Sequence, residues 1–122
     1  MEKKFDLEER LIDFAAVVID ISEALPKTLA GNHLGGQLLR SGTSPALHYG
    51  EAQAAESPAD FIHKMKVCLK ELRETFNCLR LIRKKAWIRE GLEAWVKESN
   101  ELVAIFVASI KTAQNNSLRK VK

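Results

Sequence analysis

The cations of residues 64–89 form the clearest chemical pattern in the 122-residue sequence. Six polar positions, five of them basic, recur there at alternating steps of four and three: Lys66, Lys70, Arg73, Asn77, Arg80 and Lys84. Such steps place side chains on one face of a helix, along about 27 Å at about 1.5 Å per residue. Lys85 and Arg89 extend the positive charge, and the segment holds nine Lys/Arg against only Glu71 and Glu74. This basic row can bind a phosphate backbone without reading bases.

An acidic row near the N-terminus offers a second use for the same cations. Residues 1–60 hold 5 Lys/Arg and 10 Asp/Glu, whereas residues 61–122 hold 14 and 6, so the net charge of +3 conceals halves of −5 and +8. The acidic row consists of Asp6, Glu9, Asp13, Asp20 and Glu23. The two rows can pair across one chain or between copies, or the basic row can be a plain solvated face. No aromatic residue interrupts the basic row, so any nucleic acid would be recognised through its backbone or shape.

Metal or catalytic chemistry is not indicated by the remaining reactive residues. A di-iron bundle requires Glu-x-x-His on two helices, and the chain has only the reversed His48-x-x-Glu51. His33 and His63 share no spacing with that pair. Cys68 and Cys78 are ten residues apart on one predicted helix, about 15 Å, which suits neither a disulfide nor a zinc site. Phosphate-binding glycine loops are absent from the sequence. We therefore expect no enzyme activity, no cofactor, no metal and no small-molecule substrate.

Four helices must position these residues. Apolar spacing predicts a first helix over 7–25, closed by Pro26, and a second over about 32–56 with Asn32 as its N-cap. Ser57 and Pro58 predict the start of a third helix that ends near Ala86. A fourth follows Gly91 and ends near residue 113. Four helices with short connections predict an all-α, up-down-up-down four-helix bundle over 1–114, and 115–122 is predicted to be a polar, basic, frayed tail.

The second helix is the least regular of the four. Pro45 lies inside it and predicts a kink, because proline removes a backbone donor. Gly35, Gly42, Ala46 and Gly50 give it a smooth side that would allow another helix to approach closely, in the same chain or in a neighbouring subunit.

The composition describes an ordinary globular domain. Hydrophobic residues make up 46% of the chain, and no apolar run reaches the length of about 18 residues that spans a membrane. The charged stretch over 2–10 lacks the apolar core of a signal peptide. Two cysteines form no disulfide framework, so a cytoplasmic location is expected.

The segment from residue 37 onwards carries a family resemblance. The matching pieces are QLLRSGTS at 37–44, Glu51-Ala52, Ala55-Glu56-Ser57, Asp60-Phe61, Lys64, Lys70-Glu71-Leu72 and Glu74-Thr75, with Leu25-Pro26 before them. Over about residues 5–110 the chain resembles the four-helix-bundle proteins encoded in intervening sequences of bacterial large-subunit ribosomal RNA genes, which are sometimes labelled ribosomal proteins. That family is also similar to the basic accessory protein of diversity-generating retroelements.

The resemblance implies a ring-shaped homo-oligomer, with a pentamer as the leading state, and supplies no catalytic residue. The positions that match the family pattern residue by residue are Arg40, Ser41, Thr43, Ser44, Glu51, Ser57, Asp60 and Lys64. We interpret this group as structural or interface-forming. Hydroxyl groups around Pro45 can bond the backbone there. Arg40 and Glu51 are eleven residues apart, so each needs a partner on another helix or subunit.

Two hypotheses follow from the sequence. The first is a non-enzymatic homo-oligomeric bundle that binds RNA or DNA through Lys66, Lys70, Arg73, Arg80, Lys84 and Lys85. The alternative is a protein–protein assembly module whose acidic and basic rows pair between subunits, without nucleic acid. The two differ in whether the basic row faces solvent or another chain.

Overall fold

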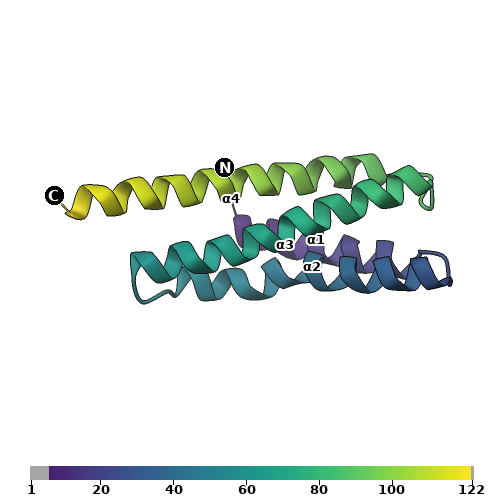
Figure 1. The fold of residues 1–122 in the computed structure, drawn as a ribbon, viewed down its shortest axis with the longest axis horizontal. Coiled ribbons are helices and arrows are strands. Elements are labelled where there is room, and N and C mark those ends of the chain that lie inside the picture. Colours follow the sequence, from purple (N-terminus) through teal and green to yellow (C-terminus); the bar gives the residue numbers. More distant parts are fainter. Residues whose placement is uncertain (1–5, 122) are drawn as a thin grey trace, which may run out of the picture.

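The computed structural model describes residues 6–121 and shows an all-α four-helix bundle (Figure 1). The helices are α1 (Leu7–Glu23), α2 (Leu29–Gln53), α3 (Pro58–Lys85) and α4 (Leu92–Val121), and no strand occurs among the described residues. Consecutive helices pack as neighbours, in the predicted up-down-up-down order. Figure 1 views the bundle with α3 in front of α1 and with α4 and α2 above and below, so α1 and α3 are diagonal. Residues 1–5 of the charged N-terminal stretch lie outside the described residues.

The first and third helices begin and pack as their sequences predict. Asp6 caps α1 by accepting from the backbone N–H of Glu9, and Ser57 caps α3 by accepting from that of Asp60. The predicted apolar face of α1 is buried, with Phe14 and Val18 at its centre. Helix α3 buries its apolar face in the same core, including Met65 and Leu72. The three-and-four spacing therefore identified both core faces correctly.

Helix α2 begins earlier than predicted and continues through Pro45, where the kink stays a prediction. Thr28, and not Asn32, is its N-cap: the Thr28 hydroxyl accepts from Gly31 N, and Asn32 N donates to the Thr28 carbonyl at 2.8 Å. The predicted N-cap was wrong because both residues have cap-forming side chains, and only the fold shows which one the chain uses. The helix continues through buried Pro45 and ends at Gln53, three residues before the predicted end.

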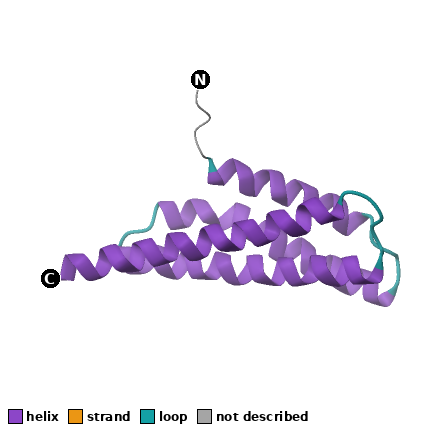
Figure 2. Ribbon diagram, turned by 90° about the horizontal axis from the view of Figure 1, so that it is seen from above, coloured by secondary structure: helices purple, strands orange, loops and turns teal. Residues whose placement is uncertain are grey.

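The connection after α3 and the length of α4 show a further difference. Ala86 ends α3 in a left-handed conformation with φ 55°, and Gly91 has φ 78° just before α4. Figure 2 shows the loops that join the four helices. Helix α4 then runs to Val121, so it extends beyond the predicted end near residue 113, and the described part of the predicted tail, 115–121, is helical. No proline or glycine follows Gly91 to stop the helix, and each added residue extends an established helix at little cost.

The glycine side of α2 serves contacts within the same chain at two positions. Gly42 packs against Val18 of α1, where a Cβ would lie only 2.6 Å and 2.8 Å from the two methyl carbons. Gly35 lies beside the Ser22 carbonyl of α1 at 3.5 Å from such a Cβ position. At Gly50 a Cβ would meet nothing within 4 Å. Helix α1 therefore covers the smooth side of α2 at Gly35 and Gly42, and the C-terminal end of this side at Gly50 has no neighbour within 4 Å.

Helix α1 covers only part of α4. Arg10 binds Glu98 of α4 at 2.7 Å, and the rings of Phe14 and Trp95 are 6.4 Å apart. These contacts place the start of α1 beside the first half of α4, and the second half of α4 extends past it (Figure 1). There Phe106 of α4 packs edge-on against Tyr49 of α2, with 5.9 Å between ring centroids.

Substitution of Gly42 by alanine should destabilise the bundle. The added methyl group would overlap Val18, and such overpacking costs about 1–3 kcal/mol, more than the helix propensity that alanine adds. Gly36→Ala on the same helix is the matched control, because a Cβ there meets nothing within 4 Å, and it should stabilise by up to about 1 kcal/mol. Urea unfolding followed by circular dichroism measures both. A Gly42→Ala variant as stable as Gly36→Ala would show that the contact does not determine the α1–α2 separation.

Candidate nucleic-acid interface

The predicted basic row lies on the solvent-exposed flank of α3. All its members, together with Lys85, are exposed: Lys66, Lys70, Arg73, Asn77, Arg80 and Lys84. The opposite side of the same helix carries Met65, Leu72 and Leu79, which are 0–1% exposed. Packing of this apolar face into the core turns the basic row outward.

Carboxylates do not neutralise this row within the described part of the chain. None of its cations, and neither Lys85 nor Arg89, has a described acidic side chain within 4.0 Å. Arg80 instead donates to the Asn77 side-chain oxygen at 3.3 Å, and its guanidinium carbon lies 5.4 Å from the centre of the Phe76 ring. The cations therefore face solvent without an ion-pair partner among the described residues.

Arg40 of α2 binds the two carboxylates that α3 carries beside the basic row. Its guanidinium donates to Glu71 at 2.8 Å and also to Glu74. Gln37 accepts from the same guanidinium at 2.9 Å. The acidic side chains are thus held at the α2–α3 contact, where the side chain of Glu71 is only 15% exposed. A cation from another helix, and not from the basic row, compensates them.

The acidic row of α1 does not pair with α3 in this chain. Its members are exposed, and no ion pair among the described residues joins α1 to α3. The reason is the diagonal position of the two helices, whose outer surfaces face opposite sides of the bundle. Ion pairs between α1 and α3 of the same chain therefore do not explain why the sequence has an acidic and a basic row. Pairing between copies stays a prediction.

The hydroxyl residues around Pro45 make three different contacts. Thr43 donates to the Leu39 carbonyl at 2.6 Å, which is the predicted bond to the backbone. The hydroxyl of Ser41 is instead 2.9 Å from that of Thr75 on α3, and both residues are fully buried. Thr75 is also within 2.9 Å of the Glu71 carbonyl, so the buried pair is satisfied. Sequence spacing could not show that Ser41 faces another helix.

Ser44 lies in an exposed row along α2. Its hydroxyl is 3.0 Å from His48 Nδ1, and His48 Nε2 is 3.9 Å from a Glu51 oxygen. The order of groups resembles a serine triad, but the histidine–carboxylate distance exceeds a hydrogen bond and both side chains are more than half exposed. We interpret the row as local helix contacts, so the neighbour of Glu51 lies on its own helix and not, as predicted, on another helix or subunit.

Asp60 and Lys64 form a local pair at the start of α3. Lys64 Nζ donates to the two Asp60 oxygens at 3.1 Å and 2.8 Å. This hydrogen bond lowers the pKa of the Asp60 carboxyl and raises the pKa of the Lys64 amine. Lys64 is thereby compensated and does not belong to the free basic row.

The cysteines are both buried and free. Burial raises the pKa of Cys68 to about 11 and also raises the pKa of Cys78, so both remain neutral thiols at physiological pH. The burial of Cys78 was not predicted, because it lies beside and not on the three-and-four apolar spacing.

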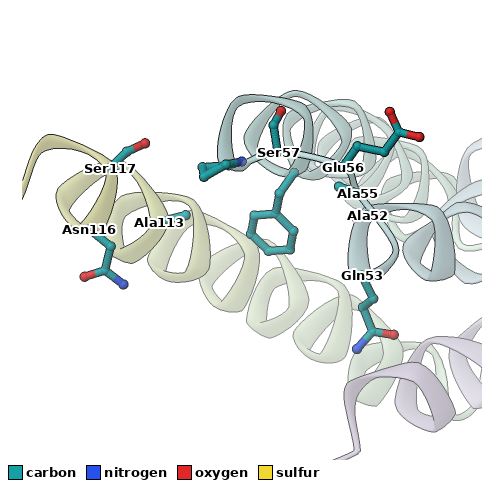
Figure 3. Close-up of a pocket in the computed structure, with 10 residues that line it drawn as sticks. Ala52, Gln53, Ala55, Glu56, Ser57, Ala113, Asn116 and Ser117 are labelled. Atoms are coloured by element: carbon teal, nitrogen blue, oxygen red, sulfur yellow. The ribbon is translucent and has the colours of Figure 1, made fainter. Parts of the chain in front are cut away.

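A hollow of about 400 Å³ lies where the α2–α3 connection meets the end of α4 (Figure 3). Ala52, Glu56 and Phe61 line one side of it, and Ala113 and Asn116 of α4 line the other. The hollow exists because α4 continues past residue 113. The sequence predicted a frayed tail there, so the hollow was not expected. No group of three or more metal-ligating side chains occurs in the described part of the chain, here or elsewhere.

The chain is similar to known proteins in sequence and in fold. The sequence profile of the 23S rRNA-intervening sequence protein family matches residues 3–108. The chain belongs to this family. A crystal structure of a protein of unknown function from the S23 ribosomal protein family of Bacteroides thetaiotaomicron VPI-5482 superposes with a TM-score of 0.79 and 32% identity, over 87% of this chain and 99% of that one. No curated protein matches the chain.

Membership of the 23S rRNA-intervening sequence protein family accounts for the fold and for the residues that carried the resemblance. Arg40 and Ser41, which match the family pattern, both bond to α3, at Glu71 and at Thr75. These two matching residues therefore connect α2 to α3. No described helix is long and apolar enough to cross a membrane.

Replacement of Arg40 by glutamine should weaken the α2–α3 contact by about 1 kcal/mol, because Glu71 and Glu74 lose their shared cation in a half-exposed site. Lys70→Gln is the matched control: it removes one charge from the basic row without breaking an ion pair and should leave stability within about 0.5 kcal/mol. Urea unfolding compares the two. High salt should reduce the difference, and equal stabilities at low salt would contradict the role assigned to Arg40.

Proposed function

We propose that the protein is a non-catalytic binder of nucleic-acid backbone, acting in the cytoplasm through the exposed flank of α3. The observation that carries this proposal is the row of uncompensated cations: Lys66, Lys70, Arg73, Arg80, Lys84 and Lys85. Each is exposed, and none has a described carboxylate within 4.0 Å. The two buried free cysteines favour a reducing compartment.

The charge of the bundle supports one orientation toward such a partner. Cations on α3 and exposed carboxylates on the diagonal helix α1 give the molecule a positive and a negative side. A polyanion would be attracted to α3 and repelled from α1, so it would meet the α3 flank first. The row of about 27 Å would face about eight base pairs at a rise of about 3.4 Å per pair.

Reversal of three charges tests this function. The variant carries glutamate in place of Lys70, Arg73 and Arg80. It should no longer bind a labelled duplex or mixed RNA, as measured by fluorescence anisotropy. The change places three carboxylates beside the phosphates. For wild-type protein the log–log slope of affinity against salt should be about −4.5 on duplex DNA if five phosphates are neutralised.

Three lysines outside the row provide a control with the same change in net charge. Lys27, Lys97 and Lys111 are exposed on or near other helices. Their joint change to glutamate should lower affinity far less than the triple change on α3. If the two triple variants lose equal affinity, net charge and not the row is responsible. If wild-type protein binds no nucleic acid at low salt, the proposal is wrong.

A second candidate function is self-assembly, and the outer surface of α1 and α2 favours it. Four large apolar side chains are exposed there: Ile12 by 44%, Ile19 by 41%, Leu39 by 41% and Leu47 by 72%. The antiparallel register set by Val18 and Gly42 places Ile12 and Leu47 at one level along the bundle axis and Ile19 and Leu39 at another. Leu47 lies on the same face of α2 as Arg40, seven residues before it. We call these four residues the α1–α2 apolar patch.

The partner that we propose for this patch is a second copy of the chain. The exposed carboxylates of α1 border the patch, and the uncompensated cations of α3 are available on any neighbouring copy. An apolar contact flanked by opposite charges fits such a copy, and the charges would set its orientation. A closed ring, with the pentamer implied by the family resemblance, would bury the patch of every subunit.

Polar substitution of the patch tests self-assembly. Ile12→Gln combined with Leu47→Gln should shift the mass found by light scattering toward that of the 13.7 kDa monomer, because the contact loses its apolar area. Leu29→Gln is the control, since Leu29 is 92% exposed at the start of α2 and away from the patch. A monomeric wild-type protein, or an oligomer insensitive to the patch, would overturn this candidate.

A further inference from the structure

A hollow lies among the side chains of the basic row toward the end of α3. It measures about 440 Å³, and its lining is Asn77, Arg80, Leu81, Arg83 and Lys84. Backbone binding needs only cations, yet this hollow also contains an amide and an apolar side chain that is 51% exposed, Leu81. All five lining residues belong to α3, so the hollow is an open depression between the side chains of one helix.

Arg80 is held in place at the hollow by two neighbours on its own helix. Its guanidinium lies over Phe76, 5.4 Å from the ring centre, and donates to Asn77 at 3.3 Å. A guanidinium held by an aromatic ring loses less freedom on binding than a free lysine would. Phe76 thus supports the row from outside its three-and-four spacing, which is why the sequence pattern did not reveal it.

Arg83 lines the hollow but adds little positive charge to it. It is paired with Glu93 of α4 at 2.8 Å, so its cation is already compensated. Arg80 and Lys84 remain as the uncompensated cations of the hollow. They project from consecutive turns of α3, with Leu81 between them in sequence.

We propose that this hollow receives one unpaired nucleotide of a single-stranded nucleic acid, an inference that rests on the proposed function and names the strand type it prefers. Arg80 and Lys84 bind the phosphate. The base stacks on the guanidinium of Arg80 and on Leu81, since every base has an apolar face. The Asn77 amide can both donate to and accept from a base edge.

The composition of the hollow favours a nucleotide over simpler anions. Inorganic phosphate would use the two cations and leave Leu81 without a role. A duplex keeps its bases stacked inside, so it would contact the row but place no base in the hollow. The effects of Arg80 and Leu81 should therefore be specific to unpaired bases.

The test compares one substitution at two places on α3. Arg80→Lys keeps the charge and removes the planar guanidinium, and Arg73→Lys makes the same change outside the lining of the hollow. Affinity is measured by anisotropy for a labelled single-stranded RNA, for a duplex of equal length, and for an abasic single strand. We expect Arg80→Lys to weaken binding of the base-containing single strand by about fivefold or more, and Arg73→Lys to weaken it by less than about twofold.

Leu81→Ser is a second probe that leaves all charges in place. It should weaken binding of the base-containing single strand and leave duplex and abasic strands unchanged. Equal effects of Arg80→Lys and Arg73→Lys, or equal affinity for abasic and base-containing strands, would overturn the nucleotide site while backbone binding stands. Absence of binding to any strand by folded wild-type protein would instead overturn the proposed function, and this site with it.

Discussion

The contact between Val18 and Gly42 is the constraint on which the other surfaces depend. It brings α1 and α2 close together and sets their register, because no side chain stands between the α2 backbone and the valine methyl groups. With α2 placed in this way, Arg40 and Ser41 project toward α3 and bind Glu71 and Thr75. The same register brings the exposed isoleucines of α1 level with the leucines of α2. Core packing on one side of α2 and polar bonding on the other thus follow from one close approach.

The separation of charge is a result of how the helices are connected. Short turns make consecutive helices neighbours, so α1 and α3 become diagonal and their outer rows cannot meet within one chain. Arg40, on the helix between them, compensates the carboxylates of α3 and leaves the cations of α3 unmatched. A different winding, with α1 beside α3, would have placed the two charged rows on neighbouring helices. The polarity of the molecule therefore belongs to its topology as much as to its composition.

Much of the fold could be predicted because the apolar spacing of α1 and α3 is strict. Met65 and Leu72, which recur at that spacing, are buried in the core. The start of α2 was wrong because Thr28 and Asn32 can both cap a helix, and tertiary contacts decide between them. Membership of the basic row was readable from sequence. Its lack of ion pairs was not, since the partner of Glu71 and Glu74 lies more than thirty residues away in the chain. The stacking of Arg80 on Phe76 likewise depends on side-chain conformations that spacing does not encode.

Because α1 is shorter than α4, the two ends of the bundle differ in local stability. Beside α1, the core is enclosed by four helices. Past the start of α1, the second half of α4 has only α2 and α3 beside it (Figure 1). Fewer apolar neighbours mean a lower free energy of local opening, so amide protons near Ala113 should exchange with solvent sooner than those near Leu102. Thermal fluctuations would then separate the C-terminal turns of α4 first, and the bundle would unfold from that end toward the α3–α4 turn.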